Sequence, residues 1–352
     1  MKIYDYVCEK FEEHLRFESM RFSNNSNPKL TDQEIITIYL FVMHHQEIFK
    51  MKKIHQFACE YLLSWFPDLG SYQAFNNRIN RLSNVMNTFV GLLLTEFTPK
   101  ECSTEFNVLD SMPIVTCSGK RSGKVAPEIT DKGYCSTKSM YYYGMKLHAL
   151  GFCNPNKLPH PEQIIFTAAS VNDFALFKEV WSEKENRTFF GDKIYNSTSF
   201  ITDMNNNFNS EMLTPVKIVK GIPDVLRKFD RAANDLYSRA VSRIRQPIEA
   251  LFSWLIEKSD IQKASKVRST KGLNLNVYAR LAVAFISLIF NSLFALVIYF
   301  KGTIAVIFCL IDLIRTIILF LFLTFIISHS MPSNGPTVNN LVSPILMGFE
   351  SI

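Results

Sequence analysis

The hydrophobic pattern of this chain changes near residue 99, and that change is the feature that most constrains its fold. In residues 1–98 apolar side chains recur at helical spacing, as at Tyr72, Phe75 and Ile79. Beyond residue 99 short apolar runs alternate with turn-forming and helical stretches. This order predicts an all-helical N-terminal domain followed by an α/β domain, in which helices flank a mixed sheet.

The N-terminal part contains two recognisable helix starts. In the Thr-Asp-Gln-Glu segment 31–34, the threonine side chain can accept a hydrogen bond from the Glu34 amide, which makes a capping box. Ser71 can cap another helix in the same way. Arg78 and Arg81 lie one helical step apart, so they share a face that either contacts DNA phosphates or is simply solvated.

Five apolar runs in the second part have the length and composition of β-strands, and three stretches suit helices. The first run is followed by Ser-Met-Pro, which should end the strand because proline cannot donate to a ladder. A loop rich in Gly, Lys and Ser is expected at 119–133. The expected strands cover 106–110, 140–150, 163–167, 187–192 and 211–216, and the expected helices cover 172–182, 197–204 and 228–258.

Two of these strands end in an acid, and a third acid lies on the last helix. Asp110 closes the first strand, and Asp192 follows an apolar strand and Gly191. Glu249 adjoins an apolar helical stripe, so we expect it near the buried side, where its charge needs a partner. Carboxylates are the oxygen ligands that magnesium takes, and two such ions can catalyse phosphoryl displacement. Each acid taken singly is more often a turn residue or a helix cap.

Other polar residues near these acids have two interpretations each. Lys146 and His148 alternate along one strand, so they share a face that either reaches phosphate or the metal site or is merely half-exposed. Asp173 is either a fourth acid of the site or, as we favour, an acid that stabilises a helix N-terminus. A basic loop beside Asp110 could carry a substrate backbone or be solvated; its cations are Lys120, Arg121, Lys124 and Lys132.

Composition narrows the class of protein only modestly. The net charge of +6 and the pI near 8.8 permit a polyanionic partner, but they fit an ordinary basic protein equally well. The seven cysteines include no C-x-x-C pair, so neither a disulfide framework nor a zinc site is indicated. With no apolar signal segment at the N-terminus, we expect a cytoplasmic protein.

Seven local matches, in order and at consistent spacing, resemble the DDE transposases of bacterial insertion sequences. The resemblance is specifically to their IS-four-like group, which has a ribonuclease-H-like catalytic core, and it covers residues 28–291. The matching segments are 30–35, 109–113, 132–134, 143–148, 167–173, 191–195 and 245–252.

The resemblance implies a metal-dependent enzyme that cleaves and joins DNA strands. It assigns catalysis and metal binding to Asp110, Asp192 and Glu249. It implies two Mg²⁺ ions, for which Mn²⁺ can substitute, and a homodimer that brings terminal inverted repeats together with target DNA. The residues expected to contact DNA are Arg245, Lys146, His148, Lys193, Arg78, Arg81 and Lys258.

The family also has a signature around its glutamate: Tyr, two residues, Arg, three residues, Glu, six residues, Lys. Arg245 and Glu249 fit it, whereas Ser242 stands at the tyrosine position and Ile256 at the lysine position. Lys258 lies nearby but out of register. In the family that tyrosine and that lysine contact the DNA end, so the departures concern end binding and leave the acids untouched.

The last part of the sequence does not resemble the family. Leu281–Phe300 carries no charge, and 301–327 is interrupted after Lys301 only by Asp312 and Arg315. Each half approaches the length that spans a bilayer. One interpretation is a membrane-associated protein. The other, which we favour, is a read-through or frameshift extension, in which case the copy could be degenerate and inactive.

These patterns predict three domains. Residues 1–98 form a helical domain for DNA-end binding, 99–291 form the ribonuclease-H-like catalytic domain, and 292–352 form an apolar and then polar tail. A different metal-dependent phosphoryl hydrolase on the same kind of core stays open as an alternative function at this point.

Overall fold

A computed structural model of the chain describes residues 2–21, 28–120, 123–154, 157–216, 231–264 and 267–288. All the helices and strands described below belong to one unit, Met1–Ile289. The predicted tail at 292–352 lies outside the described residues, as do residues 228–230 of the expected last helix.

The N-terminal part is helical, as the periodicity predicts. Thr31 accepts from the Glu34 amide while the Glu34 carboxylate accepts from the Thr31 amide, so the expected capping box is present. Ser71 caps its helix by accepting from the amide of Ala74. The elements are α1 (Lys2–Lys10), the π-helical turn η1 (Phe11–Leu15), α2 (Asp32–Gln46), α3 (Met51–Tyr61), α4 (Tyr72–Arg81) and α5 (Ser83–Glu96).

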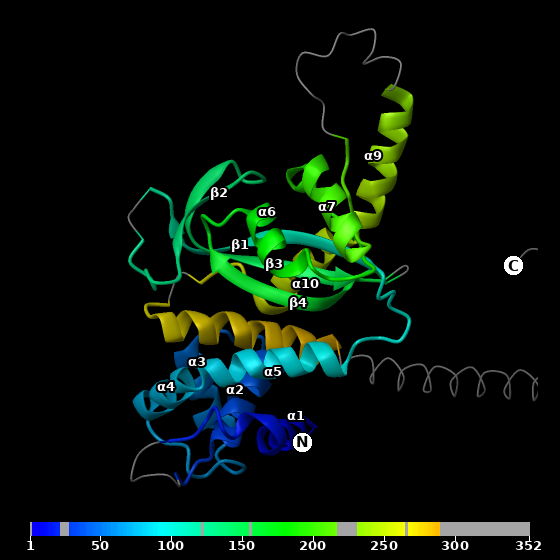
Figure 1. Cartoon of the computed structure of the whole chain (residues 1–352). Coiled ribbons are helices and arrows are strands. Elements are labelled where there is room, and N and C mark those ends of the chain that lie inside the picture. Colours follow the sequence, from blue (N-terminus) through cyan, green and yellow to red (C-terminus); the bar gives the residue numbers. More distant parts are fainter. Residues whose placement is uncertain are drawn as a thin grey trace, which may run out of the picture. The chain divides into compact units, whose positions relative to one another are not determined.

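A six-stranded mixed sheet forms the centre of the second part (Figure 1). Its order is β2-β3-β1-β5-β6, and β4 also pairs with β3. The β1–β3, β2–β3 and β3–β4 pairs are antiparallel, whereas β1–β5 and β5–β6 are parallel. The strands are β1 (Phe106–Ser118), β2 (Asp131–Cys135), β3 (Met140–Phe152), β4 (His160–Ala168), β5 (Thr188–Phe190) and β6 (Glu211–Leu213).

The prediction that β1 ends at Asp110 is wrong, because the strand continues through Pro113 to Ser118. The parallel partner β5 ends opposite Val108, which leaves that edge of β1 open. Val115 directs its N–H and C=O away from β3, toward Gln262 and Ala264. Pro113 lies two residues before Val115, so its backbone nitrogen faces the same edge, away from β3. The N–H that proline lacks is therefore not needed for any hydrogen bond between β1 and β3.

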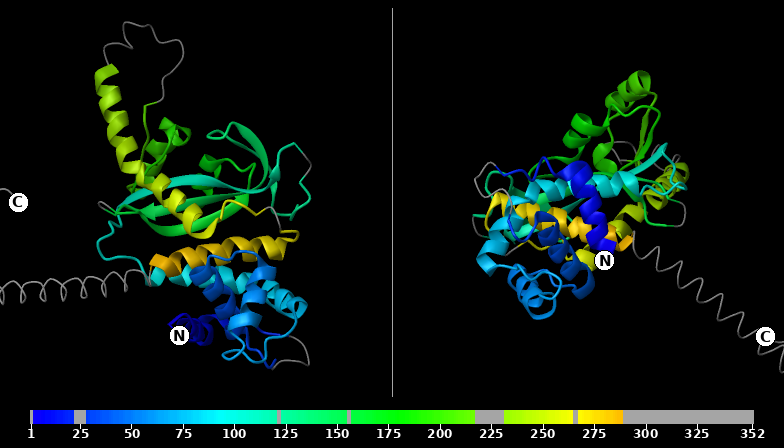
Figure 2. Two further views of the ribbon diagram at one scale, coloured as in Figure 1. Left: turned by 180° about the vertical axis from the view of Figure 1, so that it is seen from behind. Right: turned by 90° about the horizontal axis from the view of Figure 1, so that it is seen from below.

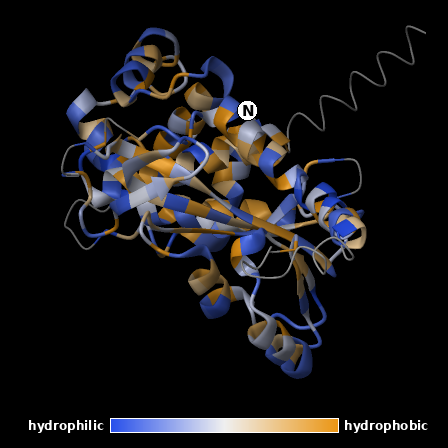
Figure 3. Cartoon of the chain, turned by 90° about the horizontal axis from the view of Figure 1, so that it is seen from above, coloured by the Kyte–Doolittle hydropathy of each residue, from blue (hydrophilic) through white to orange (hydrophobic). Residues whose placement is uncertain are grey.

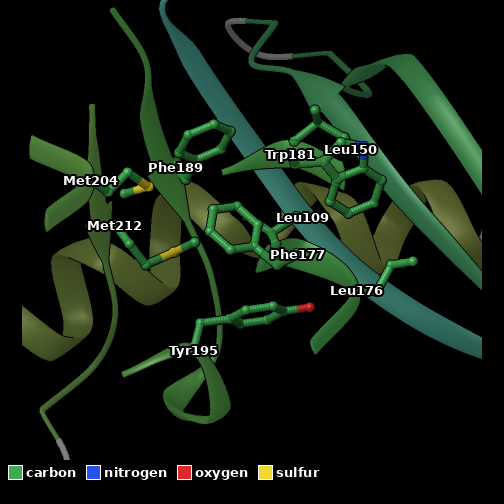
Figure 4. Packing of buried hydrophobic residues seen from close by; sticks show 9 residues of the cluster. All are labelled: Leu109, Leu150, Leu176, Phe177, Trp181, Phe189, Tyr195, Met204 and Met212. Carbon is green, nitrogen blue, oxygen red and sulfur yellow. The ribbon is translucent and has the colours of Figure 1, made fainter. Parts of the chain in front are cut away.

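Helices cover the sheet, and one apolar cluster fixes its parallel part. Leu109 and Phe189 pack with Phe177, Trp181 and Tyr195 in this cluster, which Figure 4 shows from close by. In Figure 3 hydrophobic residues gather along the sheet and the helices against it. The elements are α6 (Asp173–Leu176), the π-helical turn η2 (Phe177–Trp181), the 3₁₀ turn η3 (Lys193–Tyr195), α7 (Thr198–Phe208), α9 (Arg231–Arg245) and α10 (Pro247–Ser259).

The long helix expected at 228–258 is two helices where the structure describes it. It breaks at Gln246, and α10 begins with Pro247 at its first position. Proline lacks the N–H that would continue the hydrogen-bond ladder of α9, but its fixed φ suits a new helix start. The break separates Arg245 on one helix from Glu249 on the next.

A further helix, residues 270–288, lies between the sheet and the N-terminal helices (Figures 1 and 2). The Tyr278 ring meets Phe166 of β4 edge-to-face, with centroids 5.2 Å apart. On the other side the Arg280 guanidinium lies 5.0 Å from the Phe49 ring centroid. Within the described ranges, no helix is both long enough and apolar enough to cross a membrane.

Candidate active site

Asp110 lies in the middle of β1, opposite Ala149 of β3. Its side chain is 26% exposed, and its Oδ2 accepts a hydrogen bond from Arg245 Nη1 at 2.8 Å. The Ser111 amide donates to the other oxygen at 2.8 Å. Because successive residues of a strand point to opposite faces, Asp110 points toward Arg245 of α9 and Ser111 points the other way.

Asp192 follows β5 at the level of Asp110. The parallel register pairs Val108 with Phe190, so two residues further along each strand come Asp110 and Asp192. Adjacent strands lie about 4.8 Å apart, so this register brings the two acids close. The exposed Asp192 also caps η3 by accepting from the Lys193 amide at 2.7 Å.

Gly191, just before Asp192, is packed closely against the side chains of two neighbouring residues. A Cβ on this residue would lie 2.7 Å from the Tyr195 ring and 3.0 Å from the Met212 sulfur. Such contacts are too short for a real side chain, so the chain can pass here only as glycine. The neighbour that approaches Gly191 most closely is the Tyr195 ring.

Glu249 is in the first turn of α10, and its Oε1 accepts from Arg245 Nη2 at 2.6 Å. The expectation that it lies on the buried side is wrong, because its side chain is 55% exposed. The buried stripe of α10 runs through Ile248, Leu251 and Leu255, and Glu249 flanks it. Arg245 therefore joins Asp110 and Glu249 with a single guanidinium.

The Asp110 carboxylate is partly buried and lies near other negative charges, and both conditions affect its pKa. Burial raises its pKa to about 6, and the negative charges of Asp173 and Asp192 add to the rise. The Ser111 amide and Arg245 oppose it without cancelling it. Burial also raises the pKa of Tyr195, and the three aspartates reinforce that shift. The site thus carries more negative charge than Arg245 neutralises.

This charge and donor set fit a divalent cation. The acids offer only oxygen ligands, which magnesium and manganese favour. In the part of the chain that the structure describes, no three His, Cys, Asp or Glu side chains already stand close enough to hold a metal ion. The Arg245 guanidinium occupies the space between two of the carboxylates and supplies the positive charge there.

Lys146 and His148 lie on the face of the sheet opposite to Arg245. They pair across the sheet with Pro113 and Ser111, so they share a face with Ser111 rather than with Asp110. Lys146 Nζ donates to Asp173 Oδ1 at 3.0 Å, and Ser111 Oγ donates to Oδ2 at 3.0 Å. His148 is buried, and burial lowers its pKa to about 4.

The sequence predicts only one of the two roles that Asp173 has in the structure. It begins α6, as expected of an acid at a helix N-terminus, but it also anchors Lys146 and Ser111 directly behind Asp110. Strand alternation could have indicated this, since Ser111 must point away from the face of Asp110. Asp173 therefore supports the strand that carries Asp110.

The other predicted DNA contacts fall into two groups. Arg78 and Arg81 both donate to the buried carboxylate of Asp32, so their shared face is occupied within the helical domain. Lys193 is exposed next to Asp192, and Lys258 is half-exposed near the end of α10. Of these four residues, Lys193 is the exposed cation next to one of the acids, whereas Lys258 lies at the opposite end of α10 from Glu249.

Comparison of the sequence with models of protein families identifies the family to which the chain belongs. The sequence model of the family described as "Transposase DDE domain" matches residues 101–285, which is 185 of the 352 residues. This chain belongs to the DDE transposase family. No curated protein matches the chain at a significant level.

Membership in the family confirms the class of enzyme that the sequence resemblance implies. The transposase cleaves DNA and transfers its strands, and it acts with a divalent metal cofactor. Its mixed sheet, flanked by helices and preceded by a helical region, is the ribonuclease-H-like fold of such transposases. No finding favours a membrane protein or an inactive copy.

Proposed function

We propose that Asp110, Asp192 and Glu249 are the catalytic carboxylates of this transposase and hold two Mg²⁺ ions, for which Mn²⁺ can substitute. The observation that carries the proposal is the parallel register, which brings Asp110 and Asp192 to one level on neighbouring strands. Glu249 joins them through Arg245. The raised pKa of Asp110 supports the assignment, because unneutralised carboxylates require a cation.

The reaction is hydrolysis at the ends of the element followed by attack of the freed 3′-hydroxyl on target DNA. Bound divalent ions supply charge neutralisation at the attacking and leaving oxygens of a phosphodiester. The chain's own contribution is to hold the carboxylates in place. Arg245 fixes Asp110 and Glu249, and the Ser111 amide orients Asp110 from within the strand.

The DNA contacts that we propose at the site are Arg245, Lys193 and Lys258. Lys193 is exposed beside Asp192, where a phosphate next to the cut would lie. We assign Arg78 and Arg81 to the cluster around Asp32, because both form ion pairs with that carboxylate. We assign Lys146 and His148 to the support behind Asp110, because both contact the Asp173 carboxylate.

The larger assembly follows from the chemistry of joining two ends. We propose a homodimer that holds two terminal inverted repeats with target DNA. Residues 1–98 serve end binding, residues 99–291 serve catalysis, and the enzyme works in the cytoplasm. The family's DNA substrate and the helical character of the N-terminal part support this division.

The test of the catalytic assignment is strand cleavage by an Asp192→Asn variant. The substrate is a duplex that carries the DNA flanking the gene, incubated with Mg²⁺ or Mn²⁺. We expect the cleavage rate to fall by about a thousand-fold while DNA binding is kept, because several kcal/mol of metal-dependent stabilisation are removed. Asp203→Asn, an exposed aspartate of α7, is the matched control and should cleave normally. Cleavage by Asp192→Asn at the normal rate would refute the assignment.

A further inference from the structure

The β2–β3 hairpin presents two tyrosines on its outer face. Tyr134 and Tyr141 are directly opposite each other in the antiparallel register, and their side chains are 52% and 58% exposed. Their ring centroids lie 5.0 Å apart with the planes tilted by 56°. Because the rings are tilted rather than stacked, they leave ring surface open to solvent.

Lysines surround this tyrosine pair. Lys132 lies on the same strand face as Tyr134, and its Nζ is 5.0 Å from the centroid of the Tyr141 ring. Lys120 and Lys124 are exposed on the adjoining loop, and Lys138 is exposed on the turn, where its Nζ donates to Gln262 Oε1 at 2.6 Å. The hairpin and its loop therefore combine aromatic rings with positive charge.

Two glycines hold the basic loop against the hairpin. Gly119 donates its amide to the Tyr141 carbonyl, and a Cβ there would lie 2.5 Å from that oxygen. A Cβ on Gly123 would lie 2.7 Å from the Tyr143 ring. Since neither position has room for a side chain, the loop can approach this closely only as glycine. Lys120 and Lys124 follow these glycines and are kept beside the tyrosines.

The same segment carries two exposed acids, Glu128 and Asp131, and both accept hydrogen bonds from hydroxyl groups. Glu128 accepts a hydrogen bond from Thr270, which lowers the Glu128 pKa. A hydrogen bond with Ser170 lowers the pKa of Asp131 in the same way. The two acids remain ionised, but four exposed lysines outnumber them among the described residues of the segment, which leaves a net charge of +2 that suits a polyanion.

We propose that Tyr134 and Tyr141 form a platform on which unpaired bases of the DNA next to the cleavage point stack, while the surrounding lysines hold its phosphates. Aromatic rings interleaved with cations are the usual means of holding single-stranded DNA. The proposal rests on the DNA-cleaving function, which makes DNA the ligand. The stacking itself does not depend on which acids are catalytic, whereas the distance of the platform from the cut is measured from Asp110.

The register also sets how far this platform lies from the cut. Tyr141 precedes Ala149, the partner of Asp110, by eight residues along β3. At about 3.3 Å per residue the separation is at most about 26 Å. The tyrosines therefore lie within about eight nucleotides of Asp110, at about 3.4 Å each. The basic loop adjoins Tyr141 near the start of β3, so the prediction that it lies directly beside Asp110 is wrong.

The first test measures binding of two fluorescein-labelled duplexes, one blunt and one with a ten-nucleotide single-stranded extension. We expect the wild-type chain to prefer the extended DNA. Tyr134→Ala with Tyr141→Ala should weaken binding of the extended DNA by about 10-fold or more and leave the blunt duplex unaffected. Tyr134→Phe with Tyr141→Phe is the matched control, because it keeps both rings, and it should retain the preference.

The second test needs no variant and guards against misfolding of the hairpin. A 2-aminopurine base moved along the extension of the DNA should change its fluorescence most within about eight nucleotides of the duplex junction. Equal affinity of the wild type and the double alanine variant for extended DNA would overturn the proposal, as would a flat 2-aminopurine profile. Asp192→Asn should keep the preference for extended DNA, so a failed catalytic assignment and a failed platform give different results.

Discussion

Two clusters of arginine and carboxylate in this protein have opposite charge balances. In the N-terminal helical part Asp32, with a side chain only 10% exposed, binds three arginines, Arg21, Arg78 and Arg81. One carboxylate against three guanidiniums gives a balance of +2. Around Asp110 the balance is negative: there are four carboxylates, Asp110, Asp173, Asp192 and Glu249, and the two cations that form ion pairs with members of this group among the described residues are Lys146 and Arg245. This is a balance of −2, or −1 if the exposed Lys193 next to Asp192 is added.

The pKa values follow this balance. Burial opposes the ionisation of Asp32, but hydrogen bonds from Arg78 and Arg81 outweigh it, so the Asp32 pKa is lowered. At Asp110 burial is reinforced by neighbouring carboxylates, and the pKa rises to about 6. The comparison teaches that a buried acid with surplus cations stabilises the fold. An acid with too few cations leaves negative charge uncompensated, which fits the metal ion that we propose for this site.

Removing the Asp32 carboxylate should produce the largest change in stability. Asp32→Asn leaves Arg78 and Arg81 partly buried without their counter-charge, and we expect the free energy of unfolding to fall by about 3 kcal/mol. Urea denaturation at pH 7 measures this loss. Asp5→Asn, an exposed acid of α1, is the control. An Asp32→Asn chain as stable as the wild type would break the comparison, because the cluster would then not be structural.

Removing the Asp110 carboxylate should act in the opposite direction when EDTA is present. A folded pKa near 6 lies above the ordinary value of 3.8, so the ionised carboxylate destabilises the folded state. We expect Asp110→Asn to raise the free energy of unfolding by about 2 kcal/mol at pH 7. Loss of stability in this variant at pH 7 would contradict the proposed charge surplus.

The pH dependence separates the two acids further. The folded pKa of Asp110 is raised, so its stabilising contribution is fully present below the unfolded value and is lost as the pH rises through about 6. The gain in Asp110→Asn should therefore vanish near pH 4. The folded pKa of Asp32 is lowered, so its contribution is present above the unfolded value and is lost as the pH falls through the folded one. Urea denaturation curves between pH 3 and pH 8 test both slopes.

A smaller effect should come from the helix start next to Asp32. Thr31→Ala removes the capping box of α2, and we expect a loss of about 1 kcal/mol in the free energy of unfolding. Cleavage of DNA should not change, since Thr31 bonds to Glu34 at the start of α2 and contacts none of the proposed catalytic acids. Thr31→Ser keeps the hydroxyl and should restore most of the stability. A loss as large as that of Asp32→Asn would show that the cap, rather than the ion pairs, holds this region together.

The sequence predicts local features better than the faces on which residues meet. The capping box at Thr31 and the position of Asp192 just after a strand depend only on neighbouring residues, and both are present. The continuation of β1 through Pro113 depends on where β5 ends, and no local pattern contains that information. A terminating signal at Pro113 therefore gives the wrong strand end.

The same limit applies to the residues around the acids. Alternation correctly puts Lys146 and His148 on one side of β3, but only the register with Ser111 shows that this side faces Asp173. The apolar stripe of α10 is buried as its spacing indicates, but Glu249 flanks this stripe instead of belonging to it, and its side chain is 55% exposed. The residues of a site can thus be chosen from the sequence, whereas their mutual contacts depend on pairings distant along the chain.

The most direct test of the central claim, that the acids around Arg245 bind divalent cations, is the effect of Mg²⁺ and Mn²⁺ on thermal unfolding. The account predicts that the melting temperature of the wild-type chain rises with metal concentration relative to EDTA, because an ion that binds only the folded state stabilises it. The rise should be lost in a chain with Asp110→Asn and Asp192→Asn, and kept in Asp32→Asn. An equal rise in the wild type and the Asp110→Asn, Asp192→Asn chain would contradict the claim.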